Sequence, residues 1–332
     1  MRGVRMNLET LAKLAEVSVG TVSKAFSGSK EISEDTKDRI FALAKEHGCF
    51  DKYNKNRFEK KVVAVLCPEI KSEYYTTIAT LLERQITSHG GIMLLSTTEF
   101  SEEREMTLFS YYASYCKADG IITINQNAAL DNTFHVPAVA ILPTGNAVKS
   151  KNIDCIVSDK PNAIEQAIAY LKGLGHTEIG FVGEYLTMAK LDSFKTALRK
   201  CGLSVEERFV GISEKRFEEA GTDIMDAWIA AGNVPHAVLA AYDYIAIGLI
   251  KSLQRAGKRV PDDCSVIGMD DISVVPYLDV PLSSIHTHTE EACRMAVEIL
   301  MKKAQNQYYS SRKEIFVPSE FVARGSCAPY RQ

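Results

Sequence analysis

The feature that most constrains the fold is the pattern that begins at Val62, where short apolar runs alternate with amphipathic stretches. Runs that are apolar throughout, with helices between them, predict parallel strands buried on both faces of a sheet. Roughly ten such strands are more than one sheet holds comfortably, so the pattern predicts two lobes. We expect helices at 75–89, 163–174, 223–231 and 246–256. We expect strands at 62–67, 92–96, 120–124, 138–142, 179–182, 237–240 and 265–269.

Aromatic and acidic side chains follow three of the expected strands. Ligands of such α/β sheets bind outside the carboxyl ends of the strands, where rings offer stacking faces and carboxylates accept hydrogen bonds from hydroxyl groups. The pattern therefore indicates a polar, ring-shaped ligand. The alternative is that the tyrosines belong to the core and the aspartates cap helices, and for Asp243 we favour the cap. The residues are Tyr74 and Tyr75, Tyr242 and Asp243, and Asp270 and Asp271.

Residues 7–48 show a different pattern, that of three short helices with a tight turn between the first two. Asn7, Ser18 and Ser33 are placed to cap the three helix starts, and Gly48 is placed to end the third helix. This is the helix-turn-helix arrangement, whose second helix enters the major groove of DNA. A plain three-helix bundle with a solvated polar face explains the same periodicity, so the pattern alone leaves both interpretations open.

Charge is unevenly distributed along the 332 residues, whose formal net charge is −3. Residues 1–61 hold 13 Lys and Arg against 9 Asp and Glu, whereas the remainder holds 26 against 33. A basic segment on an acidic body suits a nucleic-acid contact that is confined to one end of the chain.

The N-terminal segment resembles the head of the lactose-repressor (LacI/GalR) family. Residues 11–28 read LAKLAEVSVGTVSKAFSG and residues 32–36 read ISEDT. The family pattern is roughly V-A-x-x-A-G-V-S-x-x-T-V-S-R-V-L-N-G followed by V-S-x-x-T, and the match runs without a gap. Further stretches that are similar to family motifs follow in family order, so that the resemblance covers nearly the whole chain. They lie at 171–176, 239–243, 260–271, 281–285 and 324–326.

The resemblance implies how the head contacts DNA. It places Val19, Gly20 and Lys24 at base-contacting positions and Ser18, Thr21 and Ser23 at phosphate-contacting positions. This chain departs from the family pattern at three points, with Glu16 for the turn glycine, Lys24 for an arginine and Ser27 for an asparagine. Lysine cannot make the planar two-pronged contact of arginine, so base selectivity at this position is expected to be softer.

Residues 51–61 correspond to an atypical hinge between the head, 1–50, and the core, 62–332. The family's proline and Ala-Arg pair are missing, and Phe58 falls where a family leucine wedges into the minor groove of DNA. Phe58 packing on the core is the alternative, and the sequence leaves the two open.

For the core, the resemblance implies two lobes like those of periplasmic binding proteins, in a homodimer that closes on a small effector. The expected crossings between lobes lie near Val157, His286 and Pro318. They divide the core into an N-lobe, about 62–157 and 287–318, and a C-lobe, about 158–286 and 319–332. The resemblance places six residues at or near effector-contacting positions, namely Tyr74, Tyr75, Asp159, Lys190, Tyr242 and Asp270.

Two of these positions depart from the family's usual sugar-binding set. Lys190 takes the place of an arginine that clamps sugar hydroxyls, and Tyr242 takes the place of a common asparagine. We therefore expect a sequence-specific repressor that binds a pseudo-palindromic DNA operator and responds to a small molecule of carbohydrate type, in the family's manner. A regulator of the same fold without a small-molecule effector, controlled by a protein partner or constitutive, is the alternative.

Other functional classes find little support. The eight cysteines form no Cys-x-x-Cys pair, and common nucleotide-binding and hydrolase motifs are missing. We therefore expect no enzyme activity, cofactor or metal. No apolar run reaches the roughly 18 residues of a membrane helix, and the N-terminus lacks the apolar region of a signal peptide. We expect a cytoplasmic protein.

Overall fold

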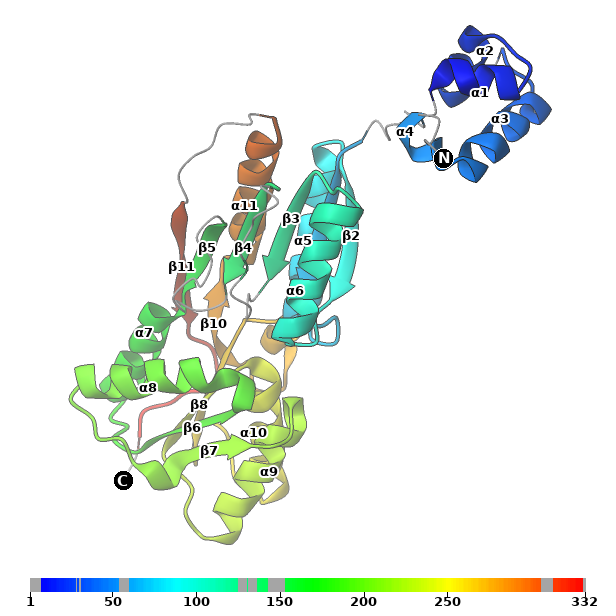
Figure 1. Ribbon diagram of the computed structural model, residues 1–332. Coiled ribbons are helices and arrows are strands. Elements are labelled where there is room, and N and C mark those ends of the chain that lie inside the picture. Colours follow the sequence, from blue (N-terminus) through cyan, green and yellow to red (C-terminus); the bar gives the residue numbers. More distant parts are fainter. Residues whose placement is uncertain are drawn as a thin grey trace. The chain divides into compact units, whose positions relative to one another are not determined.

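The computed structural model describes residues 7–27, 29, 31–53, 60–124, 130, 136–142, 153–305 and 313–330. The chain divides into two compact units, Met1–Lys61 and Val62–Gln332, which we call the head and the core (Figure 1). Phe58, the expected minor-groove wedge, lies outside the described residues. In the part of the chain that the structure describes, no helix is both long enough and apolar enough to cross a membrane.

The head contains the three predicted helices and a short fourth one. Side-chain oxygens of Asn7, Ser18 and Ser33 accept the backbone N–H three residues on, which confirms the three predicted N-caps. Gly48 has a φ of +63° directly after the third helix, where the left-handed conformation favours glycine. The helices are α1 (Leu8–Leu14), α2 (Val19–Phe26), α3 (Glu34–Glu46) and α4 (Phe50–Tyr53).

The apolar faces of these helices meet in one small core. Leu11, Val22 and Ile40 are fully buried there. The ring of Phe26 lies 5.8 Å from that of Phe50 and 6.0 Å from that of Tyr53, centroid to centroid. Because of these contacts α4, which straddles the expected boundary at residue 50, packs as part of the head.

The turn between α1 and α2 is made by a strained residue. Glu16 has a φ of +53°, a conformation that costs an L-residue roughly 1–2 kcal/mol and glycine nothing. Glycine also gains freedom in the unfolded chain, which offsets part of this cost. We expect Glu16→Gly to stabilise the head by up to about 1 kcal/mol, seen as slower amide hydrogen exchange in α1 and α2. Equal or faster exchange in the variant would contradict this expectation.

The core is a largely parallel sheet of two lobes joined through one shared strand. The strand order is β2-β1-β3-β4-β5-β11-β10-β9-β8-β6-β7. All seven predicted strands are confirmed, and β5, β7, β10 and β11 were not predicted. The N-lobe strands are β1 (Val62–Cys67), β2 (Ile92–Thr97), β3 (Gly120–Ile124), β4 (Ala138–Leu142) and β5 (Asp154–Asp159). The C-lobe strands are β6 (Ile179–Glu184), β7 (Val210–Ser213), β8 (Ala237–Ala240), β9 (Ser265–Met269) and β10 (Ser283–Thr287).

Strand β11 (Glu314–Val322) belongs to both lobes. Its first half pairs with β5 in parallel, and its second half pairs with β10 in an antiparallel ladder. Pro318 stands between the two halves, opposite Asp159. The chain passes between the lobes after β5, after β10 and within β11, close to the expected crossings at Val157, His286 and Pro318.

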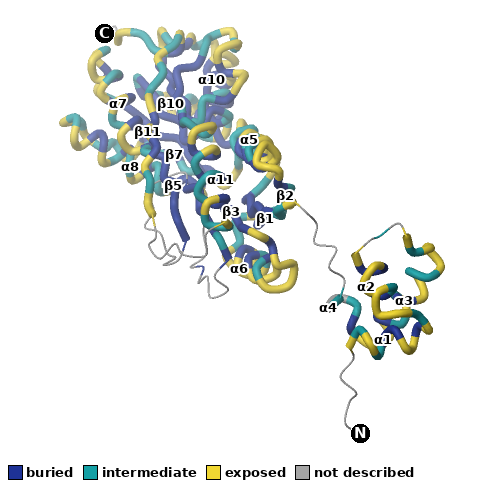
Figure 2. Tube along the Cα trace, turned by 90° about the horizontal axis from the view of Figure 1, so that it is seen from above, coloured by how far each residue is buried: buried dark blue, intermediate teal, exposed yellow. Residues whose placement is uncertain are grey.

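Helices cover both faces of each lobe, so the central strands are buried, whereas the edge strand β2 stays partly exposed (Figures 1 and 2). In the N-lobe, α5 (Glu73–Ser88) and α11 (Thr289–Gln305) pack on one face. The other face is covered by α6 (Glu102–Ser110) and the π-helical turn η1 (Tyr111–Tyr115). The C-lobe helices are α7 (Lys160–Gly173), α8 (Met188–Lys200), α9 (Phe217–Ala230) and α10 (Asp243–Arg255), with short turns η2 (Tyr185–Thr187), η3 (Glu207–Phe209) and η4 (Val275–Tyr277).

Helices α9 and α10 approach each other unusually closely. A Cβ at Gly221 would lie 2.1 Å from the backbone oxygen of Ile245, and a Cβ at Gly248 would lie 2.1 Å from that of Glu218. Only glycine fits at both contacts. The close packing fixes the start of α10, which carries two residues of the pocket described below.

Candidate DNA-binding and effector sites

The outer face of α2 carries the residues expected to contact DNA. Ser18, Val19, Gly20, Ser23 and Lys24 are exposed, and Thr21 is half-buried. A Cβ at Gly20 would meet only the hydroxyl of Ser18, at 3.6 Å, so the fold of the head does not itself require glycine there. An exposed position without a side chain leaves room for a close approach to another molecule.

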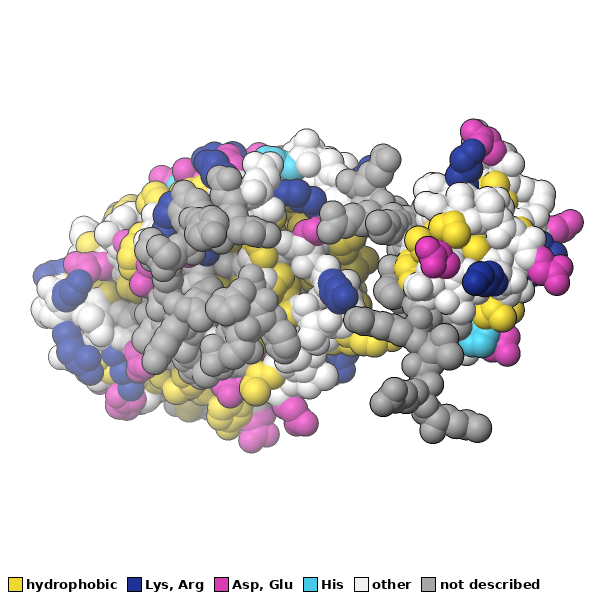
Figure 3. Space-filling view, turned by 45° about the horizontal axis from the view of Figure 1, so that its top comes forward, with side chains coloured by type: hydrophobic (Ala, Val, Ile, Leu, Met, Phe, Trp, Pro, Cys, Tyr) yellow, Lys and Arg dark blue, Asp and Glu magenta, His cyan; other side chains and the backbone are white. Residues whose placement is uncertain are grey.

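Two of the polar groups on this face have partners within the head. The hydroxyl of Ser18 caps α2 and lies 2.9 Å from that of Thr21. The Lys24 ammonium lies 2.5 Å from the Glu31 carboxylate, and both side chains are more than half exposed. An exposed pair of this kind is worth little, about 0–1 kcal/mol, so Lys24 is free to exchange Glu31 for another anion. On the side seen in Figure 3, basic and acidic side chains are interspersed on the head.

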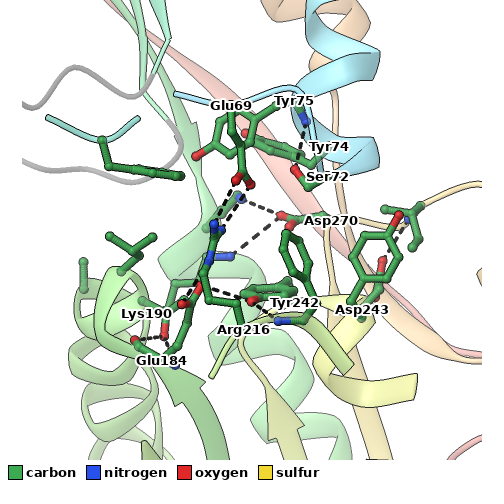
Figure 4. Close-up of a pocket in the computed structure, with 18 residues that line it drawn as sticks. Glu69, Ser72, Tyr74, Tyr75, Glu184, Lys190, Arg216, Tyr242, Asp243 and Asp270 are labelled. Carbon is green, nitrogen blue, oxygen red and sulfur yellow. Dashed lines mark hydrogen bonds and ion pairs between the residues drawn. The ribbon is translucent and has the colours of Figure 1, made fainter. Parts of the chain in front are cut away.

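A pocket lies between the two lobes of the core, at the carboxyl ends of their parallel strands (Figure 4). It is lined by side chains at the ends of β1, β2, β5, β6, β7, β8 and β9 or directly after them, which is where ligands bind in sheets of this type. The pocket brings together five of the six residues expected to contact an effector, Tyr74, Tyr75, Lys190, Tyr242 and Asp270.

Asp159, the sixth expected residue, does not line the pocket. Its carboxylate caps α7 and accepts the backbone N–H of Asn162 at 3.3 Å. The next residue, Lys160, points inward and lines the pocket in its place. A helix that starts at this point turns consecutive side chains in different directions, which explains why the neighbour of the expected residue is the one in the site.

Asp270 is the shared anion of two lysines. Its Oδ1 lies 2.8 Å from the ammonium of Lys160 and 3.9 Å from that of Lys190. Lys160 is fully buried, with its ammonium 4.7 Å from the centre of the Tyr74 ring. Burial alone would raise the pKa of Asp270, but the two ammonium groups outweigh burial and hold its pKa below the ordinary value. Asp270 therefore stays ionised and can accept hydrogen bonds from a ligand.

Lys190 is the second cation of the Asp270 pair, and burial makes its charged form unfavourable. Its ammonium donates to the backbone oxygen of Ala241 at 2.7 Å. Burial lowers its pKa to about 8, although Asp270 acts in the opposite direction. At neutral pH most of the molecules still carry the charged, hydrogen-donating form.

The backbone around Asp270 is also strained. Asp270 and Asp271 have φ values of +90° and +51°, and the N–H of Asp270 is held by the backbone oxygen of Ile285 at 2.9 Å. Conformations of this kind cost of order 1–3 kcal/mol each and cluster at functional sites. From this strained loop the carboxylate of Asp270 points toward the two lysines.

The prediction that Asp243 caps a helix is wrong. Its carboxylate instead accepts hydrogen bonds that hold the loop at residues 270–272 in place. It accepts the N–H of Ile272 at 2.8 Å and the hydroxyl of Ser284 at 2.6 Å. A Cβ at Gly268 would lie 2.1 Å from its Oδ1, so only glycine leaves room for the carboxylate. Burial raises the pKa of Asp243 well above its usual range.

A second row of charges, missed by the sequence analysis, lies beside the lysines. The guanidinium of Arg216 donates two hydrogen bonds to the carboxylate of Glu69, at 2.8 and 3.1 Å, while its Nε lies 3.1 Å from both oxygens of Glu184. Glu184 also accepts the hydroxyl of Tyr242 at 3.0 Å, and that hydroxyl in turn accepts the N–H of Phe217 at 3.0 Å. Burial raises the pKa of Tyr242, so its hydroxyl stays protonated.

The chemistry of the pocket is that of binding. In the described ranges no group of three or more His, Cys, Asp or Glu side chains could hold a metal ion. Tyrosine faces, two ammonium groups and an ionised carboxylate together match a ring that carries hydroxyl groups. A helix-turn-helix head joined to a two-lobed core with a pocket between its lobes defines the class of DNA-binding transcriptional regulators.

Comparison with known proteins agrees with this class. Residues 7–49 match the family of bacterial regulatory proteins known as the lacI family, and residues 168–327 match the periplasmic binding protein-like domain. The chain is 26% identical to the HTH-type transcriptional repressor CytR of Escherichia coli (strain K12), over 96% of this chain and 95% of that protein. It belongs to the LacI family of transcriptional regulators, a family of non-enzymatic proteins.

Two solved structures share the fold over nearly the full length. One is the lac repressor dimer bound to operator and the anti-inducer ONPF, with a TM-score of 0.70, 19% identity and coverage of 97% of this chain and 99% of that one. The other is the complex of the transcriptional regulator CelR with cellobiose, with a TM-score of 0.68, 22% identity and coverage of 97% and 100%.

Proposed function

We propose that this protein is a cytoplasmic repressor that binds operator DNA as a homodimer and changes its DNA affinity when a sugar-like molecule binds between the lobes of the core. The observation that carries the proposal is the pocket at the strand ends, in which aromatic rings surround the buried Lys160–Asp270–Lys190 group. A change in lobe closure would alter the spacing of the two heads and so shift the population that can bind DNA.

On the DNA side, the proposal assigns Val19, Gly20 and Lys24 to base edges, and Ser18, Thr21 and Ser23 to phosphates. Two heads in a dimer would occupy half-sites about one helical turn, ~34 Å, apart.

Exposed apolar side chains support self-association of the core. Leu94 and Leu95 lie on the edge strand β2, and Tyr277 is 85% exposed in the C-lobe.

On the ligand side, the ionised Asp270 would accept hydroxyl protons, Lys190 would donate to ring or hydroxyl oxygens, and the tyrosines would pack on the apolar faces of the ring. The presence of cellobiose in the CelR structure supports a carbohydrate as the ligand class. Lys190 and Tyr242 differ from the residues that usually bind sugars in the family. The sugars that relatives bind therefore do not identify the particular ligand of this protein.

The lowered pKa of Lys190 gives this binding a pH dependence. The ligand would be bound by the charged ammonium, which is lost as the pH rises through about 8. Affinity should be level below that pH and fall above it, by at most about tenfold per pH unit. Calorimetric titration with a sugar ligand from pH 6.5 to 9.5 measures the profile. Lys190→Met should bind more weakly at neutral pH and lose this dependence, and an unchanged profile in the variant would exclude Lys190 as the donor.

A thermal-shift screen against sugars, sugar phosphates, nucleobases and organic acids tests the ligand assignment, run in parallel on Asp270→Ala. A compound that stabilises the wild type and not the variant supports this pocket, whereas a compound that stabilises both equally places the binding elsewhere.

Selection from random DNA tests the proposal that the protein binds a palindromic operator as a dimer. A protein that stays monomeric at micromolar concentration and enriches no palindrome would overturn it.

A regulator without a small-molecule effector remains the second candidate, and one observation favours it. Asp270, Glu184 and Glu69 each already pair with a cation of the protein itself. In that case no compound in the screen would stabilise the protein, and substitutions in the pocket that leave the fold intact would leave operator binding unchanged.

A further inference from the structure

Arg216 joins the two lobes through side chains of the protein alone. Glu69 follows β1 in the N-lobe, whereas Arg216 and Glu184 belong to the C-lobe and lie after β7 and at the end of β6. The planar guanidinium fits the Glu69 carboxylate with two parallel hydrogen bonds (Figure 4), which is the strongest form of such a pair. The Glu69 and Glu184 side chains are only 13% and 5% exposed, so solvent screens the row weakly.

Aromatic rings hold the same guanidinium from both lobes. Its central carbon lies 5.2 Å from the ring centre of Phe100 in the N-lobe and 4.7 Å from that of Phe217 in the C-lobe. Burial would lower the pKa of Arg216, but the two carboxylates outweigh burial and raise it. The positive charge is therefore permanent, and each lobe supplies one anion and one ring to it.

The position of Arg216 also makes it a wall of the pocket. Its side chain lines the interlobe pocket and two outer clefts, one beside Ile70 and Glu99 and the other beside Lys215 and Glu219. The Arg216–Glu69 contact thus stands between the pocket and the outer surface on this side. A molecule that passed through here would have to part the two side chains.

Two weaker contacts cross between the lobes next to this row. The carboxylate of Glu73 accepts the backbone N–H of Ser273 at 2.7 Å, and the ammonium of Lys71 lies 4.9 Å from the ring centre of Phe217. The amide of Ser273 is a natural reporter, because its partner is on the opposite lobe and the bond breaks when the lobes separate.

We propose that Arg216 is a clasp that sets the closure of the lobes, with Glu69 as its partner across the cleft. The inference rests on the proposed function, because closure matters to DNA binding only in an effector-controlled regulator. The clasp supplies part of the closing free energy from within the protein and holds Glu184 and Tyr242 in place for a ligand. Arg216 is a positioning residue, since it acts by fixing the lobes and not by discriminating among ligand atoms.

Amide hydrogen exchange on the full-length protein tests the clasp directly. In Arg216→Ala and in Glu69→Ala, exchange of the segment that contains Ser273 should rise about tenfold, equivalent to about 1.4 kcal/mol of closing free energy. Exchange in β8, inside the C-lobe, should stay unchanged. Glu69→Ala is the cleaner variant because Arg216 keeps its partner Glu184. Lys215→Ala is the matched control, since it removes a neighbouring cation whose partner, Asp223, is in the same lobe.

The double variant Glu69→Ala/Arg216→Ala separates a clasp from two independent effects. A clasp predicts about tenfold faster exchange in the double variant, as in each single one, because the second substitution removes nothing further. Exchange at the wild-type rate in the single variants, or close to a hundredfold acceleration in the double variant, would overturn the proposal.

The link to regulation is measured separately, with an operator selected from random DNA. Glu69→Ala should change the operator affinity of the effector-free protein at least threefold, and Lys215→Ala should not. A loosened cleft with unchanged operator affinity would overturn the regulatory role of the clasp. If the wild type selected no operator, the proposed function would fail, while the exchange result would still decide whether the clasp exists.

Discussion

Replacing Asp270 by asparagine is expected to destabilise the core by about 3–5 kcal/mol, because it leaves two buried ammonium groups without their anion. The side chain of Lys160 is only 1% exposed, and its ammonium lies 4.7 Å from the centre of the Tyr74 ring, so solvent cannot replace the lost anion. Effector binding should weaken in the same variant, since the charged acceptor becomes a neutral amide and one of its acceptor oxygens becomes a donor. Urea unfolding followed by circular dichroism, together with the thermal-shift screen, measures both effects.

Asp226→Asn is the matched control for this variant. It removes a carboxylate from an ion pair with Arg255 in which both side chains are 55% exposed, where about 0–1 kcal/mol is expected. The pH profile adds a signature. The pKa of Asp270 is lower in the folded state than its ordinary value of 3.8 in the unfolded chain. The ionised carboxylate therefore stabilises the wild type in full above pH 3.8, and this stabilisation is lost as the pH falls through the lower pKa of the folded state. Equal stabilities for the two variants would refute this account of the buried pair.

Lys24→Ala should weaken operator binding by about 5- to 150-fold, or roughly 1–3 kcal/mol, the usual range for a side chain that contacts a base edge. The fold of the head should not change, because among the described residues the side chain of Lys24 pairs only with the exposed carboxylate of Glu31. Fluorescence anisotropy with a selected operator, at several salt concentrations, measures the loss.

Two further variants show whether the loss reflects base contact. Lys13→Ala removes a cation from the exposed side of α1 and should cost only a few-fold. Glu31→Gln frees Lys24 from its partner and should strengthen binding slightly. The variant could instead weaken binding to all DNA sequences equally and reduce the slope of log affinity against log salt concentration by about one. Lys24 would then contact a phosphate and not a base.

The sequence predicted the framework of the core because its central strands are apolar throughout and bounded by helices. The four unpredicted strands lack that signal. β10 reads Ser-Ser-Ile-His-Thr, β11 contains Pro318 and two glutamates, and β7 has only four residues. β5 and β10 are almost entirely buried, yet both mix Ser, Asp, His or Thr with their apolar residues, so their sequences contain no continuous apolar run.

Whether a strand has a continuous apolar run also decides which pocket residues could be predicted from the sequence. Tyr74, Tyr242 and Asp270 follow predicted strands, and the carboxyl ends of parallel strands converge, so their meeting was foreseeable. Glu69 and Glu184 obey the same rule and could have been found by applying it to every strand. Arg216 follows β7, a strand without a recognisable sequence signal, and its role appears only when the two lobes are placed face to face.

The double membership of β11 has a consequence for biosynthesis. Neither lobe has a complete sheet until residues 314–322 have left the ribosome, because β5 and β10 both await this strand. The head, by contrast, is built from contiguous residues near the start of the chain. A nascent chain therefore has the means to fold the helices of its head long before its core can be complete. A product cut short ahead of Glu314 would leave both lobes unfinished, with the edges of β5 and β10 unpaired and therefore prone to aggregation. Such a product would carry a complete head on an incomplete core.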